Sequence, residues 1–341
     1  MTKQRHNKVV FGISFGFFGI IIIFLLMLLM PLSSHPDMRI LVHEGDSIDV
    51  IYAQLDTMAR PPSKWMFHVM TNLTGYDKHI KAGIYDCSKQ STWQTFRRMR
   101  HGSRMPMKLV ITTARTKEDL AGKLAKMLVL NDSAELSDTF SDTTICARCG
   151  VTPETVIGLF LPNTYEVFCP LEPGELVYRM KRESDRFWTE ERLQQAEAQG
   201  LTAMEVMTLA SIVDRETNNA KEKPWVAEMY LNRLRKGMPL QADPTIIYAH
   251  NDFSIRRVTG ELLRIDSPYN TYKNKGLPPG PIGIPDLKSI EAVLKPATHN
   301  YLYMCAKEDF SGTHNFAETF AEHQQNARKY AAALNAKGIT E

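Results

Sequence analysis

The feature that most constrains this chain is an uncharged apolar run of 22 residues near its N-terminus, Val9–Met30. A helix of that length spans about 33 Å, which is enough to cross the hydrocarbon core of a bilayer. Lys3, Arg5 and Lys8 precede the run, so the positive-inside rule predicts a cytoplasmic N-terminus. We therefore expect a cytoplasmic tip over residues 1–8, followed by a single transmembrane helix.

A cleaved signal peptide is the alternative explanation of this run. The apolar core of a signal peptide usually has about 7–15 residues, and the segment "PLSSHP" after the run is a poor cleavage site. No cysteine follows the run directly to accept a lipid. The sequence therefore favours a retained anchor in the cell (inner) membrane, with the rest of the chain in the periplasm or another extracytoplasmic space.

Charge and cysteine content exclude some classes of function. The net charge is +3, and the three basic residues before the apolar run account for all of it, so nothing indicates a nucleic-acid partner. The five cysteines cannot all pair within one chain. The motif "CARC", Cys146–Cys149, has half of a zinc-site pattern without a second half. A structural role, or a local disulfide in an oxidising compartment, is the expectation.

The remaining sequence predicts an α+β fold with a small strand–helix module at 38–104 and a mixed α/β domain at 105–335. The strand–turn–helix pattern of the module recurs weakly at Met107–Leu128. Residues 131–150 are polar and predict an irregular connection, and Glu175–Gln199 predicts one long charged helix that Gly200 ends. Within the module we expect a strand and helix over 39–55, a helix over 61–73, a strand over 81–88 and a helix over 91–102.

Glu216 is the first candidate for chemistry. It ends the predicted helix Thr202–Thr217 and shares one helical face with Leu209, Ile212 and Val213. A carboxyl group on an apolar face loses water, which raises its pKa and lets it remain protonated near neutral pH as a general acid. The simpler interpretation is a solvated surface charge at the end of a helix, which is what most glutamates are.

Further candidates follow Glu216 along the chain. The segment "DPT" after Gln241 fits a helix start, with Asp243 as the N-cap and proline in the first turn. The segment Ser267–Asp286 joins aromatic and amide side chains to five prolines and predicts a rigid loop without helix. Aromatic rings and amides suit the apolar faces and hydroxyls of a sugar, although a purely structural loop has the same composition.

The C-terminal segment predicts a last helix. Phe316 and Phe320 stand four residues apart, as core contacts of a helix do. His314 and His323 have no third ligand nearby, so we expect hydrogen-bonding histidines and no metal site.

Taken together, four segments resemble the YceG-like family of endolytic murein transglycosylases: "LASIVDRET", "VAEMYLNRLRKGMPLQADPTIIYA", "PYNTYKNKGLPPGPIGIP" and "THNFAETFAEH". Their order and spacing agree along about 130 residues. The anchor and the N-terminal module, which looks like the family's LysM-like domain, extend the resemblance over nearly the whole chain. Asp214 and Arg215 depart from the usual Glu and Lys but keep their charge, and the loop departs after "PPGPI".

The resemblance implies a peptidoglycan lytic transglycosylase, a lyase that cuts the MurNAc-β-1,4-GlcNAc bond inside glycan strands and leaves 1,6-anhydroMurNAc ends. Its catalytic acid falls on Glu216, and no cofactor or metal is implied. The implied partners are peptidoglycan strands, the membrane and the cell-wall synthases of the elongation machinery, where cutting would limit nascent strand length. The glycan groove would contain Asn232, Gln241, Asp243, Tyr269, Asn270 and Tyr272.

Two alternatives remain open from the sequence. A muramidase would use Glu216 as the acid and Asp243 to activate water, at a carboxyl separation of roughly 6.5–9.5 Å if inverting or about 5–5.5 Å if retaining. A non-catalytic wall-binding scaffold would rely on the LysM-like module instead. The identity of the product ends separates the transglycosylase from the muramidase. The effect of Glu216→Gln separates both enzymes from the scaffold.

Overall fold

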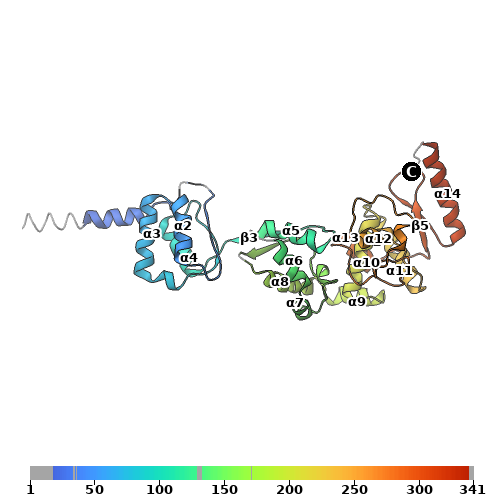
Figure 1. Ribbon diagram of the computed structural model, residues 1–341, viewed down its shortest axis with the longest axis horizontal. Coiled ribbons are helices and arrows are strands. Elements are labelled where there is room, and N and C mark those ends of the chain that lie inside the picture. The colour runs from blue at the N-terminus through green and yellow to red at the C-terminus, as the bar shows by residue number, and fades with distance from the viewer. Residues whose placement is uncertain (1–17, 34, 36, 129–132, 170, 338–341) are drawn as a thin grey trace, which may run out of the picture. The chain divides into compact units, whose positions relative to one another are not determined.

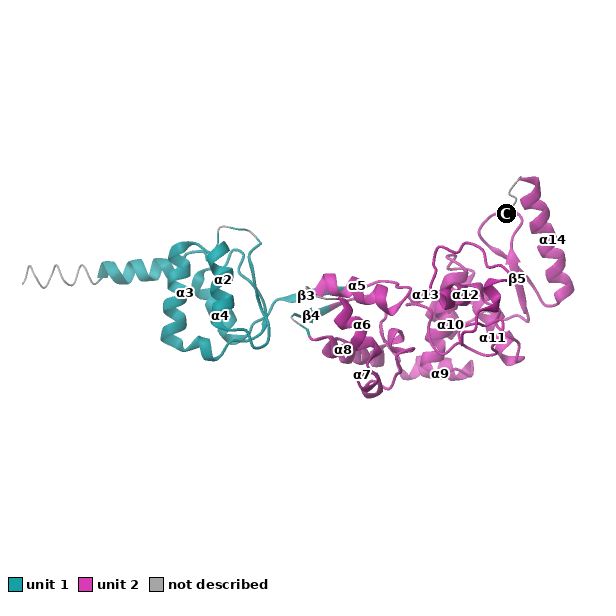
Figure 2. Cartoon of the chain, in the orientation of Figure 1, with its two compact units in different colours: residues 1–109, 166–171 teal, residues 110–165, 172–341 magenta. Residues whose placement is uncertain are grey.

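The computed structural model describes residues 18–33, 35, 37–128, 133–169 and 171–337, and it has the mixed helix and strand content of an α+β protein (Figure 1). The chain divides into two compact units, coloured separately in Figure 2. Unit 1 comprises residues 1–109 and 166–171, and unit 2 comprises residues 110–165 and 172–341. The chain therefore passes between the units three times, because the short segment 166–171 belongs to unit 1.

Unit 1 is a small helical core against a two-stranded antiparallel sheet. In that sheet Arg39 lies opposite Asp86. The rings of Phe67 and Phe96 meet edge to face, with centroids 5.2 Å apart, at the centre of the core. Every strand and helix that the sequence predicts in this module is present: β1 (Arg39–Val42), α2 (Ile48–Met58), α3 (Pro61–Thr74), β2 (Gly83–Asp86) and α4 (Thr92–His101). The structure adds a 3-10 helix, η1 (Tyr76–Lys78), which the sequence did not predict.

The N-terminal apolar run lies only partly within the described residues. Residues 18–29 are helical, whereas residues 9–17 of the predicted transmembrane span lie outside the described part of the chain. Among the residues that the structure describes, no helix is both long and apolar enough to cross a membrane.

The strand and helix that the sequence predicts at 107–128 are present as β3 (Pro106–Ile111) and α5 (Lys117–Leu128), and unit 2 begins within β3, at residue 110. β3 pairs with β4 (Asn163–Phe168). A short 3-10 helix, η2 (Val156–Leu159), precedes β4.

The predicted irregular connection over 131–150 is wrong, because this segment forms α6 (Ser133–Ser141) and α7 (Thr143–Arg148). Few apolar residues mark these helices, yet α6 buries Leu136 and Phe140 and packs on α5 and α8, and α7 packs on α6. Cys146 and Cys149 are both buried and free, with no disulfide between them. Burial raises the pKa of both thiols, so the motif has a structural role in this fold.

The single helix expected over Glu175–Gln199 is two helices, α8 (Pro173–Phe187) and α9 (Glu190–Ala198). The break occurs at Thr189, whose side chain accepts a hydrogen bond from the backbone of Arg192 and caps α9. A threonine N-cap stabilises a helix start, and here it outweighs the continuous charged pattern. Gly200 follows with φ +73°, as a glycine after a helix end should.

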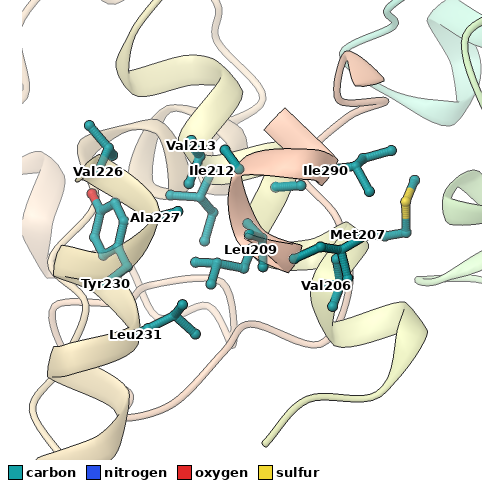
Figure 3. Packing of buried hydrophobic residues seen from close by; sticks show 14 of the residues in the cluster. Val206, Met207, Leu209, Ile212, Val213, Val226, Ala227, Tyr230, Leu231 and Ile290 are labelled. Atoms are coloured by element: carbon teal, nitrogen blue, oxygen red, sulfur yellow. The ribbon is translucent and has the colours of Figure 1, made fainter. Parts of the chain in front are cut away.

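One hydrophobic cluster of unit 2 is built by three helices that pack against one another. Figure 3 shows the contact: Leu209 and Ile212 of one helix face Ala227 and Leu231 of the second and Ile290 of the third. The elements of this half of the unit are α10 (Ala203–Glu216), α11 (Lys223–Arg235), α12 (Asp243–His250), the 3-10 helix η3 (Leu262–Arg264) and α13 (Leu287–Leu294). Residues 267–286 contain no helix or strand, as their prolines predict.

The chain ends with a hairpin and a helix: β5 (Tyr303–Ala306), β6 (His314–Ala317) and α14 (Phe320–Ala336). Tyr303 lies opposite Ala317 in the hairpin. The prediction that Phe316 and Phe320 anchor one helix is wrong, since Phe316 lies in β6 and the Phe320 side chain is 57% exposed at the start of α14. Their spacing of four is accidental, because a capping box at Thr319 starts the helix between them.

Candidate active site

Glu216 is the last residue of α10, where the buried face of that helix opens to a cavity. A capping box between Thr202 and Glu205 fixes the start of the helix. Leu209 and Val213 on the same face are fully buried, whereas the side chain of Glu216 is partly exposed. The helical spacing in the sequence therefore predicts correctly that this carboxyl group lies in line with apolar side chains.

The protonation of Glu216 is set by opposing influences. Burial raises the pKa of the carboxyl group, the hydroxyl of Tyr230 lowers it by donating a hydrogen bond to Oε1 over 2.5 Å, and the negative charge of Asp243 raises it. The outcome is a pKa of about 7. At neutral pH the group is then present in both its acid and its base form, which suits a residue that gives a proton and later takes one back.

A buried ion-pair cluster fixes the end of α10. Lys223, at the start of α11, has a side chain only 3% exposed. Its Nζ donates to Asp214 Oδ1 at 2.9 Å, to Asp286 Oδ2 at 2.8 Å and to Ser289 Oγ at 2.7 Å. The last turn of α10, the first turn of α11 and the end of the proline-rich loop are thus joined, two residues from Glu216.

A cavity of about 340 Å³ adjoins Glu216, within unit 2. Its wall mixes carboxylate, phenol, guanidinium, imidazole and apolar groups, as pockets for polar ligands do. Three of the residues proposed from the sequence for the glycan groove line this cavity: Gln241, Asp243 and Tyr272. The other lining residues are Met229, Tyr230, Arg233, Leu240, Tyr303, Met304, Cys305, Ala306, His314, Phe320 and His323.

Asp243 does not cap α12, contrary to the simplest expectation from "DPT". The N-cap of that helix is Ala242, and Asp243 is already its first helical residue, with no side-chain cap. Its carboxylate instead accepts a hydrogen bond from the hydroxyl of Tyr272 over 2.5 Å. Burial and this bond raise the pKa of Tyr272. The carboxylate is therefore held at the cavity, where its charge acts on Glu216.

Gln241 is held in an unusual backbone conformation by its neighbours. Its φ is +54°, a left-handed value that a residue other than glycine adopts rarely and at a cost of about 1–3 kcal/mol. Arg233 donates to its side-chain oxygen at 2.5 Å and also to the carbonyls of Pro239 and Leu302. The backbone N–H of Gln241 donates to the carbonyl of Thr271. Such enforced geometry is typical of functional sites.

His314 and Glu222 form a second polar pair at the cavity. Glu222 Oε1 accepts from the backbone N–H of His314 at 2.6 Å, and Oε2 lies 3.0 Å from His314 Nδ1. The hydroxyl of Thr217, next to Glu216, also donates to Glu222. His314 fits the expectation of a hydrogen-bonding histidine, whereas the buried Nδ1 of His323 has no hydrogen-bond partner among the described residues. Within the described residues, no group of three or more histidine, cysteine or acidic side chains is placed to hold a metal ion.

The other three groove candidates lie outside the wall of this cavity. The amide of Asn232 donates to the carbonyls of His299 and Tyr301 and supports the chain before β5. Asn270 is fully buried and donates to the carbonyls of Leu263 and Ile265. Tyr269 packs on Tyr248, with ring centroids 4.8 Å apart. Their contacts are those of residues that hold loops in place.

Sequence reasoning missed Tyr230 and Arg233 as functional candidates. Both lie on α11, and both are buried. The available signal was chemical, because a phenol and a guanidinium on a buried helical face need polar partners. Tyr303 and His323 carried no comparable signal, since the hairpin and α14 bring them to the cavity from distant parts of the sequence.

These contacts describe an acid–base site built around one carboxyl group of raised pKa. The YceG-like family matches residues 40–329, and the chain belongs to this family. Two curated relatives have the name endolytic murein transglycosylase. The one from Bacillus subtilis is 36% identical over 183 residues, which are 53% of this chain and 49% of the relative. The one from Streptococcus pneumoniae is 33% identical over 137 residues, 39% of this chain and 25% of the relative.

The chain thus spans about half the length of the first of these relatives and about a quarter of the second. A crystal structure of a yceG-like protein from Listeria monocytogenes matches with a TM-score of 0.56 and 28% sequence identity. That match covers 86% of this chain and 99% of the other. The fold and the family are therefore shared over most of the chain.

Proposed function

We propose that this chain is a peptidoglycan lytic transglycosylase that cuts the MurNAc-β-1,4-GlcNAc bond within glycan strands. The observation that carries the proposal is Glu216, a partly buried carboxyl group with a pKa of about 7 at an open cavity, with one oxygen held by Tyr230. The name shared by the B. subtilis and S. pneumoniae relatives supports the same activity.

The chemistry needs one carboxyl group in two successive roles. Tyr230 occupies Oε1 of Glu216, so Oε2 is the oxygen available to the substrate. Protonated Glu216 gives its proton to the glycosidic oxygen as the bond to C1 of MurNAc breaks. The resulting carboxylate then takes the proton of the C6 hydroxyl, whose oxygen bonds to C1 and closes the 1,6-anhydro ring. No water is consumed, and Glu216 ends protonated again.

Tyr230 serves both steps. Its hydroxyl hydrogen bond favours the carboxylate, while burial favours the neutral acid. A group in balance between the two forms can donate and accept a proton at the same pH. Asp243 and Gln241, at the same cavity, are placed to position sugar hydroxyls and amides.

Hydrolysis by a muramidase mechanism is the second candidate, and the position of Asp243 favours it. This carboxylate lines the same cavity as Glu216 and is not used as a helix cap. In a muramidase Asp243 would activate a water molecule, which would add to C1 and leave a reducing end. Its hydrogen bond with Tyr272 would orient it for that role.

The product ends decide between the candidates. The purified full chain is incubated with sacculi, and the released muropeptides are analysed by mass spectrometry. Internal fragments with 1,6-anhydroMurNAc ends are expected, and Glu216→Gln abolishes their release without abolishing binding to sacculi. Reducing ends that disappear in Asp243→Asn would establish hydrolysis instead. Release that persists in Glu216→Gln would overturn the site, and retained binding without release by the wild-type chain would favour a wall-binding scaffold.

We further propose that Val9–Met30 anchors the chain in the cell (inner) membrane, with unit 1 acting as a LysM-like wall-binding module. The cutting site would then face nascent strands on the extracytoplasmic side, next to the synthases of the elongation machinery, and would limit strand length. Carbonate extraction of membranes tests the anchor. The full chain should remain in the pellet, whereas recovery in the supernatant would contradict the anchor without affecting the chemistry.

A further inference from the structure

A second, smaller cavity of unit 2 is lined by two arginines. It has a volume of about 180 Å³, and Arg115 and Arg215 lie at its wall. The rest of the wall is mostly apolar: Pro244, Ile247, Tyr248, Phe253, Ile255 and Ile282. This volume is smaller than that of a pocket for a whole small ligand, which is about 300–1,000 Å³. It fits a charged side group on a short apolar stem.

Neither guanidinium forms an ion pair with an acidic side chain within the part of the chain that the structure describes, although the charges of Asp119 and Asp214 act on Arg215. Among the described residues, neither Arg115 nor Arg215 makes a side-chain hydrogen bond or an ion pair, and Arg115 only stacks over the ring of Phe253 at 5.1 Å. The two nearest acids are already engaged: Asp119 pairs with Lys123 at 2.9 Å, and Asp214 pairs with Lys223 at 2.9 Å.

The two arginines also repel each other. Burial lowers the pKa of Arg215, the charge of Asp214 opposes this, the charge of Arg115 lowers the pKa further, and the charge of Asp119 raises it. Two like charges that repel each other cost free energy in the empty site. An anion that binds between them removes that cost, and it gains charge-assisted hydrogen bonds.

The proline-rich loop brings the pair together. The backbone N–H of Ile284 donates to the carbonyl of Ala114 at 2.8 Å and fixes the segment that carries Arg115. A side chain at Gly283 would lie 2.5 Å from that carbonyl, 3.4 Å from Arg215 Nη2 and 3.5 Å from Arg115 Cα. Only glycine leaves room for this approach, and its φ of +147° also requires glycine.

This cavity is connected by the chain to the active site. Arg215 directly precedes Glu216, and Pro244 directly follows Asp243, so the same two segments line both cavities. A substrate bound at Glu216 would therefore have its neighbouring groups within reach of the arginines.

We propose that Arg115 and Arg215 form a subsite for a carboxylate of the peptidoglycan strand, borne by the muramyl residue next to the cut. This inference rests on the proposed function and adds a specificity determinant to it. The carboxylate would come from the stem peptide where one is attached, or from the lactyl group where the peptide has been removed, because an attached peptide holds the lactyl carboxyl group as an amide. The apolar wall, with Ile247 and Phe253, fits the short aliphatic stem that carries such a group.

The test compares the full chain with its Arg115→Gln variant on matched strands. One strand preparation keeps its stem peptides, a second has all carboxyl groups converted to methylamides, and a third has the peptides removed so that the lactyl carboxylate remains. Arg115→Gln should raise KM about tenfold on the first preparation, with kcat little changed, because a charge-assisted contact is worth about 1.4 kcal/mol or more. On the methylamide strands the KM values of the two proteins should be equal.

Arg264→Gln is the matched control, since Arg264 is an exposed arginine that pairs with Glu261 away from both cavities. It should behave as the wild type on every preparation. A KM ratio above one on peptide-free strands shows that the subsite also accepts the free lactyl carboxylate, and a ratio of one restricts the subsite to the stem peptide. If Arg115→Gln has the same ratio on native and methylamide strands, the subsite does not exist.

A binding measurement separates this inference from the proposed activity. Calorimetry of a soluble muropeptide with a stem peptide uses the Glu216→Gln chain, which requires no cleavage. Adding Arg115→Gln to this chain should raise Kd about tenfold. Adding Arg215→Lys instead, as the conservative change, should raise Kd by less. Unchanged Kd in both would overturn the subsite even if the chain cuts strands, and weakened Kd would support it even if the chain does not.

Discussion

At the residue scale, the reactivity of Glu216 depends on groups that can be removed one at a time. Tyr230→Phe removes the hydrogen bond that favours the carboxylate, so the pKa of Glu216 should rise above about 7. The acid form would then persist to higher pH. We expect the alkaline limb of the kcat/KM profile to move up by roughly 0.5–1 pH unit, since such a bond is worth about 0.5–1.5 kcal/mol.

Asp243→Asn provides the opposite control for that profile. Removing the negative charge of Asp243 takes away a cause of the raised pKa of Glu216, so the alkaline limb should move to lower pH. Movement of both variants in the same direction would mean that Glu216 is not the group that the profile reports.

Glu216→Gln should also change stability in a pH-dependent way. The folded-state pKa of about 7 lies above the ordinary 4.5, so between these values the unfolded chain loses the proton first and wild-type stability falls. The neutral glutamine avoids this loss. We expect the variant to be more stable than the wild type by about 1–3 kcal/mol at pH 8, measured by urea denaturation.

The pH at which the stability difference vanishes is the check on its cause. Below pH 4.5 both the carboxyl group and the amide are neutral, so the two proteins should have equal stability there. A difference of the same size at pH 4 and pH 8 would point to packing, not to the charge of Glu216.

At the element scale, the sequence predicts best where local signals agree. α10 was predictable because its capping box, apolar face and length all indicate the same helix. The proline-rich loop was predictable because proline excludes helix. α6 and α7 were not, because tertiary packing on neighbouring helices outweighs their polar composition.

The candidate site divides in the same way. Glu216 follows from helical periodicity, and Gln241, Asp243 and Tyr272 follow from the resemblance to the family. The amide of Asn270 bonds to loop carbonyls in the structure, and in sequence such an amide looks the same as one that binds sugar. Tyr230 was missed because the value of its hydroxyl depends on the distance to Glu216, which only the packing of α10 on α11 determines.

The cluster around Lys223 should be the costliest polar contact between elements to remove. Lys223→Met leaves Asp214 and Asp286 without their buried cation, and breaking such a pair costs about 3–5 kcal/mol. Denaturant unfolding measures the loss. Lys181→Met is the matched control, because its pair with Asp185 lies at the surface and should contribute under about 1 kcal/mol. Equal losses in the two variants would refute the special role of the cluster.

At the scale of the whole molecule, each unit has its own hydrophobic core. The buried cluster of unit 1 is centred on α2, α3 and α4, and that of unit 2 is centred on α10, α11 and α13. The two clusters have no residue in common among the described residues. Separate cores of this kind predict two unfolding transitions, because each is a cooperative unit by itself.

Phe96→Ala tests this independence. Phe96 is 1% exposed and packs edge to face on Phe67 and Tyr76, so its loss should cost unit 1 about 3–5 kcal/mol. In calorimetry one transition should move to lower temperature while the other keeps its midpoint. Leu209→Ala, in the core of unit 2, should move the other transition instead. If each substitution lowers both midpoints together, the two units unfold as one, and the segment 166–171 that returns to unit 1 is the covalent reason to examine first.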